Sequence, residues 1–361
     1  MLKRRDFIRH TSLLGAGLLT YPNLLANPNL FSIFQNKKLI WANLLHLSFN
    51  MWGDRTDLQE KKLDYNNPNL DCLKASDYAK AYRPFLTFDQ STWDALLKRM
   101  SDSGMNMVVI DLGDGVKYKS HPEIAVKNAW SKEKLVNELV KMRKMGLEPI
   151  PKMNFATTHS AWLGEYARQI SSKKYYMVCR DLINEVIDLF DKPRFFHLGM
   201  DEETAYQPYK EYVVVRKYDL WWKDLYYLVD LVEKRGSRAW IWSDFGWQSP
   251  EHNALFFKKM PKNILQSNWY YFKEFNENVK EVKFYEQLEK HGYDQLPCGG
   301  NWNNNQNFRL TVEYCKKIIS SSKLYGFLAT SWAPTLKSCL TKNLATIEQV
   351  EIAKKEFYQY K

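Results

Sequence analysis

Three consecutive carboxylates follow a short apolar run in residues 194–203, which read RFFHLGMDEE. The apolar half predicts a buried strand, and the acids stand where the chain would leave the sheet. Acidic side chains at the C-terminal end of a buried parallel strand are costly to desolvate and are usually kept for chemistry. Neighbouring Asp201 and Glu202 could be driven apart in pKa, leaving one as a proton donor and the other as an anion. Helix capping is the alternative, but it suits one acid better than three, so we predict a catalytic role.

Polar and aromatic residues also follow the other apolar runs of the chain. The candidates for substrate contact are Asp111, Asn154, His159, His197, Trp242, Asp244, Trp269, Trp302 and Trp332. For His197, which lies inside its predicted strand, a buried supporting role competes with ligand contact. A single tryptophan is more often packing than ligand contact, but several together could stack on the flat apolar faces of pyranose rings. Carboxylates beside aromatic platforms therefore favour a carbohydrate ligand.

The elements that would position these residues alternate between strands and helices. Strands are predicted at 39–49, 105–111, 147–154, 195–198, 238–244, 263–269, 295–302 and 325–332. Helices with an apolar stripe are predicted at 91–100, 131–145, 182–190 and 221–234, and the polar stretch 57–82 is predicted to be an inserted loop. Eight such units indicate a single-domain (β/α)₈ TIM barrel, in which all strand ends share one rim. A doubly wound sheet is the competitor, but LGDGVKY after the second strand matches a phosphate-binding glycine turn poorly.

The segment HLGMDEE resembles the HxGGDE signature of the family 20 glycoside hydrolases, the β-N-acetylhexosaminidases. His197, Gly199, Asp201 and Glu202 match the signature, and Met200 stands where the family has its second glycine. The resemblance implies a (β/α)₈ barrel with tryptophans around the sugar, and neither cofactor nor metal. It also implies that the acetamido oxygen of the substrate attacks the anomeric carbon. Glu202 would then be the general acid, and Asp201 would orient the acetamido group.

A conventional retaining glycosidase needs a second carboxylate about 5 Å across the site. The end of the seventh predicted strand, CGGNWNNN, supplies none. Asp111, Asp114 and Asp244 remain candidates for an inverting base or for ligands of sugar hydroxyls. Asp244 is the best of these, as the partner carboxylate of a glycosidase with a different sugar specificity. A non-catalytic glycan-binding barrel is a second hypothesis, motivated by Met200. A metal-dependent hydrolase using His46, Asp111, His197 and Asp201 is a third, disfavoured because the chain lacks an HxH or HExxH spacing.

The N-terminus resembles a twin-arginine export signal. Arg4 and Arg5 precede Phe7, and an apolar run at 12–19 is too short to span a bilayer permanently. We predict a signal peptide at 1–26, a glycosidase-like barrel at 27–361, and a periplasmic or secreted protein. No stable membrane span is expected once the signal is removed.

Charge and cysteine content exclude some functions. The net charge of +11 falls to +8 when the four basic residues and one acid of 1–26 are left out. Acids alternate with the remaining lysines, which favours solvated helix faces over a nucleic-acid surface but permits an acidic polysaccharide as substrate. The five cysteines are far apart without a CxxC pattern, so structural zinc is disfavoured. One disulfide is possible without an assignable pairing, and the odd count leaves at least one unpaired thiol.

Overall fold

The computed structural model describes residues 38–55, 63–206 and 208–359. The predicted signal peptide at 1–26 lies outside the described residues, so it stays a prediction. The chain divides into two units after Lys38, and every element below belongs to the unit Leu39–Lys361. No helix in the described residues is long and apolar enough to cross a membrane.

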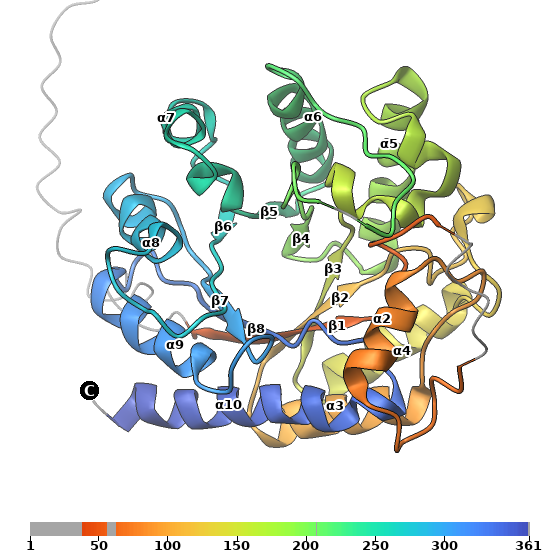
Figure 1. The fold of residues 1–361 in the computed structure, drawn as a ribbon, viewed down its shortest axis with the longest axis horizontal. Helices are drawn as coiled ribbons and strands as arrows, with labels where there is room; N and C mark the ends of the chain where they lie inside the picture. Colours follow the sequence, from red (N-terminus) through yellow and green to blue (C-terminus); the bar gives the residue numbers. More distant parts are fainter. Residues whose placement is uncertain (1–37, 56–62, 207, 360–361) are drawn as a thin grey trace, which may run out of the picture. The chain divides into compact units, whose positions relative to one another are not determined.

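Eight parallel strands form the sheet of this unit (Figure 1). They are β1 (Ile40–His46), β2 (Met107–Asp111), β3 (Glu148–Lys152), β4 (Phe195–His197), β5 (Arg238–Trp242), β6 (Leu265–Ser267), β7 (Cys298–Gly300) and β8 (Gly326–Thr330). Their order is β6-β5-β4-β3-β2-β1-β8-β7, and a parallel bridge between Trp269 and Cys298 brings the two end strands together. The predicted (β/α)₈ barrel is therefore confirmed, and all eight predicted strands are present.

Helices follow the strands and cover the outside of the sheet. They are α3 (Gln90–Asp102), α4 (Lys132–Lys144), α5 (Lys173–Leu189), α6 (Leu220–Lys234), α7 (Pro250–Lys259), α8 (Lys280–Lys290), α9 (Asn307–Ile318) and α10 (Leu340–Gln359). Short 3₁₀ turns occur at η2 (Pro122–Ile124), η3 (Thr157–His159), η4 (Ala161–Arg168), η5 (Asp244–Trp247) and η6 (Lys337–Cys339). Side chains of Asp89, Ser131, Ser172 and Ser249 accept hydrogen bonds from the first-turn N–H groups of α3, α4, α5 and α7. The four predicted helices are confirmed, although α5 begins nine residues earlier than predicted, at Lys173.

The stretch 57–82 contains a helix, α2 (Cys72–Lys80), so its prediction as a loop was wrong. The Asp71 side chain caps this helix by accepting hydrogen bonds from the first-turn N–H groups, and only small residues of α2, such as Ala75 and Ala79, are buried. A disulfide joins Cys72 to Cys339 at the end of η6, with the two Cα atoms 4.8 Å apart. Because α2 is held by a covalent link rather than by a stripe of large apolar side chains, helical periodicity alone could not reveal it.

The other three cysteines, Cys179, Cys298 and Cys315, are free and buried. The structure thus contains the one disulfide that the sequence allowed but could not pair. The barrel is filled mainly by apolar side chains, among them Val109, Ile150 and Trp240.

Candidate active site

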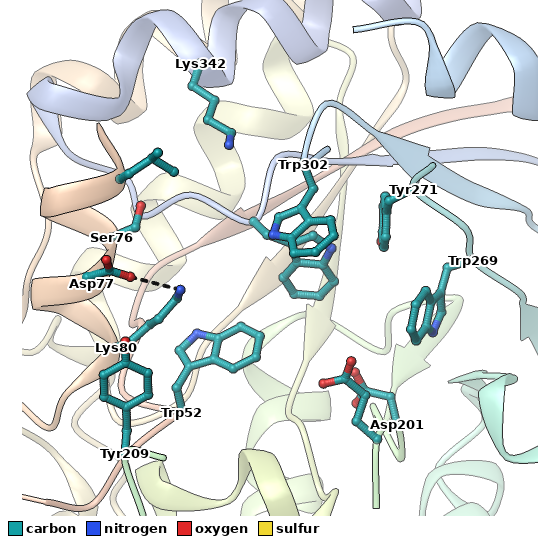
Figure 2. Close-up of a pocket in the computed structure, with 13 residues that line it drawn as sticks. Trp52, Ser76, Asp77, Lys80, Asp201, Tyr209, Trp269, Tyr271, Trp302 and Lys342 are labelled. Atoms are coloured by element: carbon teal, nitrogen blue, oxygen red, sulfur yellow. Dashed lines mark hydrogen bonds and ion pairs between the residues drawn. The ribbon is translucent and has the colours of Figure 1, made fainter. Parts of the chain in front are cut away.

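A pocket of about 510 Å³ opens at the C-terminal ends of the strands (Figure 2). This volume lies within the range of about 300–1,000 Å³ that small-ligand sites occupy. Of the residues predicted from the sequence, the pocket wall includes Asp201, Glu202, Trp269, Trp302 and Trp332. The two candidate catalytic carboxylates and three of the four candidate tryptophans therefore share one space.

Both carboxylates stand on a turn whose backbone is unusual. Gly199, Met200 and Glu202 have φ values of 71°, 70° and 51°, in the left-handed region that disfavours residues with a Cβ atom. A Cβ atom at Gly199 would lie 2.1 Å from Oδ1 of Asn154, so only glycine fits there. Met200 keeps the left-handed conformation with its side chain fully buried against Arg216. Met200 thus holds, with a buried side chain, a backbone conformation that glycine adopts more readily.

Asp201 lies at the buried end of the pocket and is only 5% exposed. Asn154 Nδ2 donates a hydrogen bond of 2.9 Å to Asp201 Oδ1, and Nδ1 of His159 lies 3.6 Å from the same oxygen. Burial raises the pKa of Asp201, partly opposed by the charge of His159. Asn154 and His159, both predicted as substrate contacts, thus hold this carboxylate and do not themselves line the pocket.

His159 also contacts the second carboxylate, with Nε2 3.4 Å from Glu202 Oε2. Burial alone would lower the pKa of His159, but the charges of Asp201 and Glu202 outweigh it and raise this pKa. Burial would raise the pKa of Glu202, but contact with His159 lowers it overall. His159 therefore bridges the two carboxylates, and Glu202, with a side chain 35% exposed, is the one that faces solvent.

Asp244 lies behind the turn rather than in the pocket wall and is 1% exposed. Its Oδ2 accepts a hydrogen bond of 2.8 Å from the backbone N–H of Glu202 and one of 3.2 Å from Gln248 Nε2. Burial, together with the charge of Asp201, raises the pKa of Asp244 to about 8. A neutral carboxyl at this position fixes the backbone of Glu202 in its left-handed conformation.

His197 and Trp242 lie below the pocket and do not line it. His197 is fully buried, and its Nδ1 accepts a hydrogen bond of 3.0 Å from the backbone N–H of Gly199. Burial lowers its pKa well below the usual range, so the ring is neutral. The ring centroid of Trp242 lies 4.5 Å from that of His197 and 6.0 Å from that of Trp332. These two residues support the turn and the aromatic wall from below.

Asp111 is buried in the barrel and pairs with Lys152, whose Nζ lies 2.5 Å from Oδ2. Burial would raise the pKa of Asp111, but Lys152 and His46 together outweigh it and lower the pKa to about 2. His46 Nδ1 lies 3.5 Å from the same oxygen. Within residues 38–55, 63–206 and 208–359, no group of three or more His, Cys, Asp and Glu side chains is arranged to hold a metal. The metal-dependent hypothesis gains no support from these residues.

Several pocket residues were missing from the candidates. Trp52 and Tyr271 complete the aromatic wall, and the Tyr271 hydroxyl lies 2.9 Å from Thr330 Oγ1. Trp52 follows the first strand as the other tryptophans follow theirs, so it belongs to the aromatic set that the strand ends predict. Lys80, on α2, also lines the pocket, and nothing in the sequence placed that helix beside the strand ends.

No family model matches the sequence, and no curated protein matches it. Several solved structures, however, align with this chain. A β-N-acetylhexosaminidase from Bacteroides fragilis aligns with a TM-score of 0.54 and 13% identity, over 86% of this chain and 65% of its own length. The Streptomyces plicatus N-acetyl-β-hexosaminidase aligns with a TM-score of 0.56 and 11% identity, over 89% and 68% of the two chains. Dispersin B gives a TM-score of 0.50 and 15% identity, over 73% and 94%.

The chain thus spans about two thirds of the length of the Bacteroides fragilis enzyme. At these identities the comparison concerns the fold, and it agrees with the resemblance that the HLGMDEE segment carries. The chain therefore shares the (β/α)₈ fold of solved β-N-acetylhexosaminidases.

Proposed function

We propose that the chain is a glycoside hydrolase that releases a terminal N-acetylhexosamine from a glycan. The observation that carries this proposal is the placement of Asp201 and Glu202, bridged by His159, in a pocket walled by aromatic side chains. Aromatic faces suit the apolar faces of a pyranose ring, and the paired carboxylates supply acid and anion. The fold shared with solved β-N-acetylhexosaminidases supports the same substrate class.

In the proposed reaction the acetamido oxygen attacks the anomeric carbon as the bond to the leaving oxygen breaks. Asp201 accepts a hydrogen bond from the acetamido N–H and stabilises the positive charge that develops on this group. Glu202 gives its proton to the leaving oxygen. Water then attacks the anomeric carbon, returns a proton to Glu202 and restores the acetamido group.

The lowered pKa of Glu202 in the free protein must be reversed for it to act as an acid. A bound sugar would cover its partly exposed side chain and remove water, which raises a carboxyl pKa. His159 is the proton source within reach, because the raised pKa of this residue keeps a proton beside Glu202.

The carboxylates of the pocket favour the acetamido oxygen as nucleophile over a protein group. In the wall formed by described residues, the carboxylates are Asp77, Asp201 and Glu202. Asp77 belongs to α2 and its side chain is 62% exposed. Asp244, the alternative partner carboxylate, is covered by the turn that it holds. Besides Asp201, to which the proposal assigns the acetamido group, no carboxylate of the described wall thus accompanies Glu202 in the buried part of the pocket.

Activity is tested by chromophore release from aryl glycosides of N-acetylglucosamine, N-acetylgalactosamine, glucose and galactose. We expect turnover of the acetamido sugars alone. Glu202→Gln should remove it, by a factor of about 10²–10⁴ for loss of a general acid. Glu313→Gln on α9, an exposed residue that does not line this pocket, is the matched control. Turnover of plain glycosides, or full activity in Glu202→Gln, would contradict the proposal. Glycan binding without turnover, unchanged in Glu202→Gln, would establish a binding barrel instead.

We also propose export through the twin-arginine pathway to the periplasm or beyond. The segment RRDFI motivates this proposal, and the disulfide Cys72–Cys339 supports it because such bonds persist in oxidising compartments. Replacing Arg4 and Arg5 by lysine should retain the protein in the cytoplasm, as measured by cell fractionation. Unchanged export of that variant would contradict the proposal.

A further inference from the structure

The pocket has a second, cationic side that the proposed chemistry does not use. Lys80 at the end of α2 and Lys342 near the start of α10 both line it (Figure 2). Their side chains point from two different elements toward the aromatic residues, and Asp201 lies on the far side of those residues. One binding space thus has carboxylates at one end and ammonium groups at the other.

Lys342 forms no ion pair with any carboxylate that the structure describes, and its side chain is half-buried. Burial, followed by the positive charge of Lys80, lowers the pKa of Lys342. Two cations that face the same space repel each other, and a bound anion would relieve this repulsion.

Asp77 offsets this charge only in part. It lies 3.1 Å from Lys80 Nζ, and its side chain is 62% exposed. Exposed pairs of this kind are weak, so Lys80 can exchange this partner for a ligand at little cost. Among the residues that line this side of the pocket, two ammonium groups face one carboxylate. The carboxylate of Asp71, which caps α2 outside the wall, offsets part of the charge of Lys342.

The cationic side is held in place by its surroundings. The disulfide Cys72–Cys339 joins the first residue of α2 to the last residue of η6, three positions before Lys342. Asn301 Nδ2, after β7, donates a hydrogen bond of 2.8 Å to the backbone oxygen of Lys342. A ligand that binds both lysines therefore meets a largely preformed site, which reduces the entropic cost of binding.

The location of Lys80 and Lys342 relative to Asp201 indicates which part of the substrate the two lysines contact. Asp201 is buried, whereas Leu73 and Asp77 of α2 are exposed members of the same wall. A terminal sugar bound at Asp201 therefore lies deep, and the sugar to which it is linked lies nearer α2 and the solvent.

We propose that Lys80 and Lys342 form a subsite for an anionic group, a carboxylate or a sulfate ester, on the sugar linked to the released N-acetylhexosamine. This inference rests on the proposed function, and it specifies the substrate class as an acidic glycan. The excess of basic residues over the whole chain agrees with an acidic polymer as partner.

The test compares disaccharides in which N-acetylglucosamine is β-linked to glucose, glucuronic acid or glucose 6-sulfate, with release of N-acetylglucosamine as the readout. We expect larger kcat/KM values for the acidic disaccharides, and the two acidic probes distinguish carboxylate from sulfate. Lys342→Gln should lower the ratio of kcat/KM between acidic and neutral substrates about threefold to tenfold, and Lys80→Gln should lower it less because Lys80 already has a partner. Lys342→Arg should retain most of the ratio. Lys234→Gln, at an exposed lysine of α6 paired with Asp230, is the matched control and should leave it unchanged.

Equal kcat/KM values for neutral and acidic disaccharides in the wild-type protein would overturn the inference. An unchanged ratio in both glutamine variants would do the same. If no disaccharide is cleaved, calorimetric binding of the same three probes separates the two proposals. Tighter binding of an acidic probe, weakened by Lys342→Gln, would keep the subsite while the proposed hydrolase fails. Equal binding of all three would refute the subsite itself.

Discussion

Asp244→Asn tests whether a neutral carboxyl holds the turn that carries Asp201 and Glu202. Asp244 is buried, and its pKa is raised to about 8, whereas an unfolded aspartate titrates near 3.8. Between these two values the folded protein holds a proton that the unfolded chain has released. The stabilising effect of this group is therefore complete at acidic pH and is lost progressively as the pH rises toward 8.

The size of the effect follows from one proton. Wild-type stability should lose about 1.4 kcal/mol per pH unit from this group alone. Asparagine cannot ionise, so the free energy of unfolding of Asp244→Asn minus that of the wild type should grow by about 3 kcal/mol between pH 5 and 7. The asparagine oxygen can still accept from the Glu202 N–H. The new NH₂ group replaces an oxygen that has no hydrogen-bond partner. Burying this unpaired donor lowers the free energy of unfolding of the variant by about 1–3 kcal/mol, by the same amount at every pH.

The assay is urea unfolding of both proteins from pH 5 to 8, with the difference plotted against pH. Asp89→Asn is the control, because hydrogen bonds from Ser91 and Thr92 outweigh burial and lower the pKa of Asp89. Asp89 is therefore ionised in both the folded and the unfolded state above pH 5. The free energy of unfolding of Asp89→Asn minus that of the wild type should thus not change with pH. A flat difference for Asp244→Asn as well would refute the raised pKa and the neutral support of Glu202.

Three further changes test the turn and the disulfide. His159→Gln should remove the proton source beside Glu202, and hydrolysis should fall about 10²–10⁴-fold at neutral pH; an unchanged pH–rate profile would exclude the shared proton. Gly199→Ala should destabilise the protein by about 2–4 kcal/mol in urea unfolding, because its Cβ would meet a buried amide oxygen at 2.1 Å. Replacing both Cys72 and Cys339 by alanine should cost about 3–5 kcal/mol by the same measurement, since the bond closes a loop with a sequence separation of 267 residues. Wild-type stability of either variant would contradict the corresponding contact.

The barrel and the position of Asp201 and Glu202 at its rim could be predicted because each rests on local sequence. Apolar runs of strand length alternate with helical stripes, and the DEE triplet follows one of these runs directly. The sequence could not predict which of the remaining candidates line the pocket and which are buried beneath it. Asp111, His197 and Trp242 all follow or end strands, yet they are buried beneath the pocket, whereas Trp269 and Trp332 reach into it. The position of a residue in the sequence predicts that it lies near the rim of the barrel, but not how deeply its side chain is buried. That depth depends on the register and tilt of neighbouring strands.

The cationic side of the pocket could not be predicted from the sequence, because it arises from contacts between distant parts of the chain. Lys80 and Lys342 are separated by most of the barrel sequence, and each resembles the many other lysines of the helices. Their proximity follows from the pairing of Cys72 with Cys339, which five widely spaced cysteines could not specify.

The disulfide has a further consequence for resistance to proteolysis. Because it links Cys72 to Cys339, residues 72–339 form one covalent ring that includes seven of the eight strands, β2 to β8. A protease that cuts any single loop within this ring opens it without releasing a fragment. The cut ends remain tethered to the rest of the barrel, so the strands on either side of the break stay at high local concentration and can remain paired. A protein exposed to foreign proteases would thereby tolerate a single cut, and this tolerance would disappear under reducing conditions.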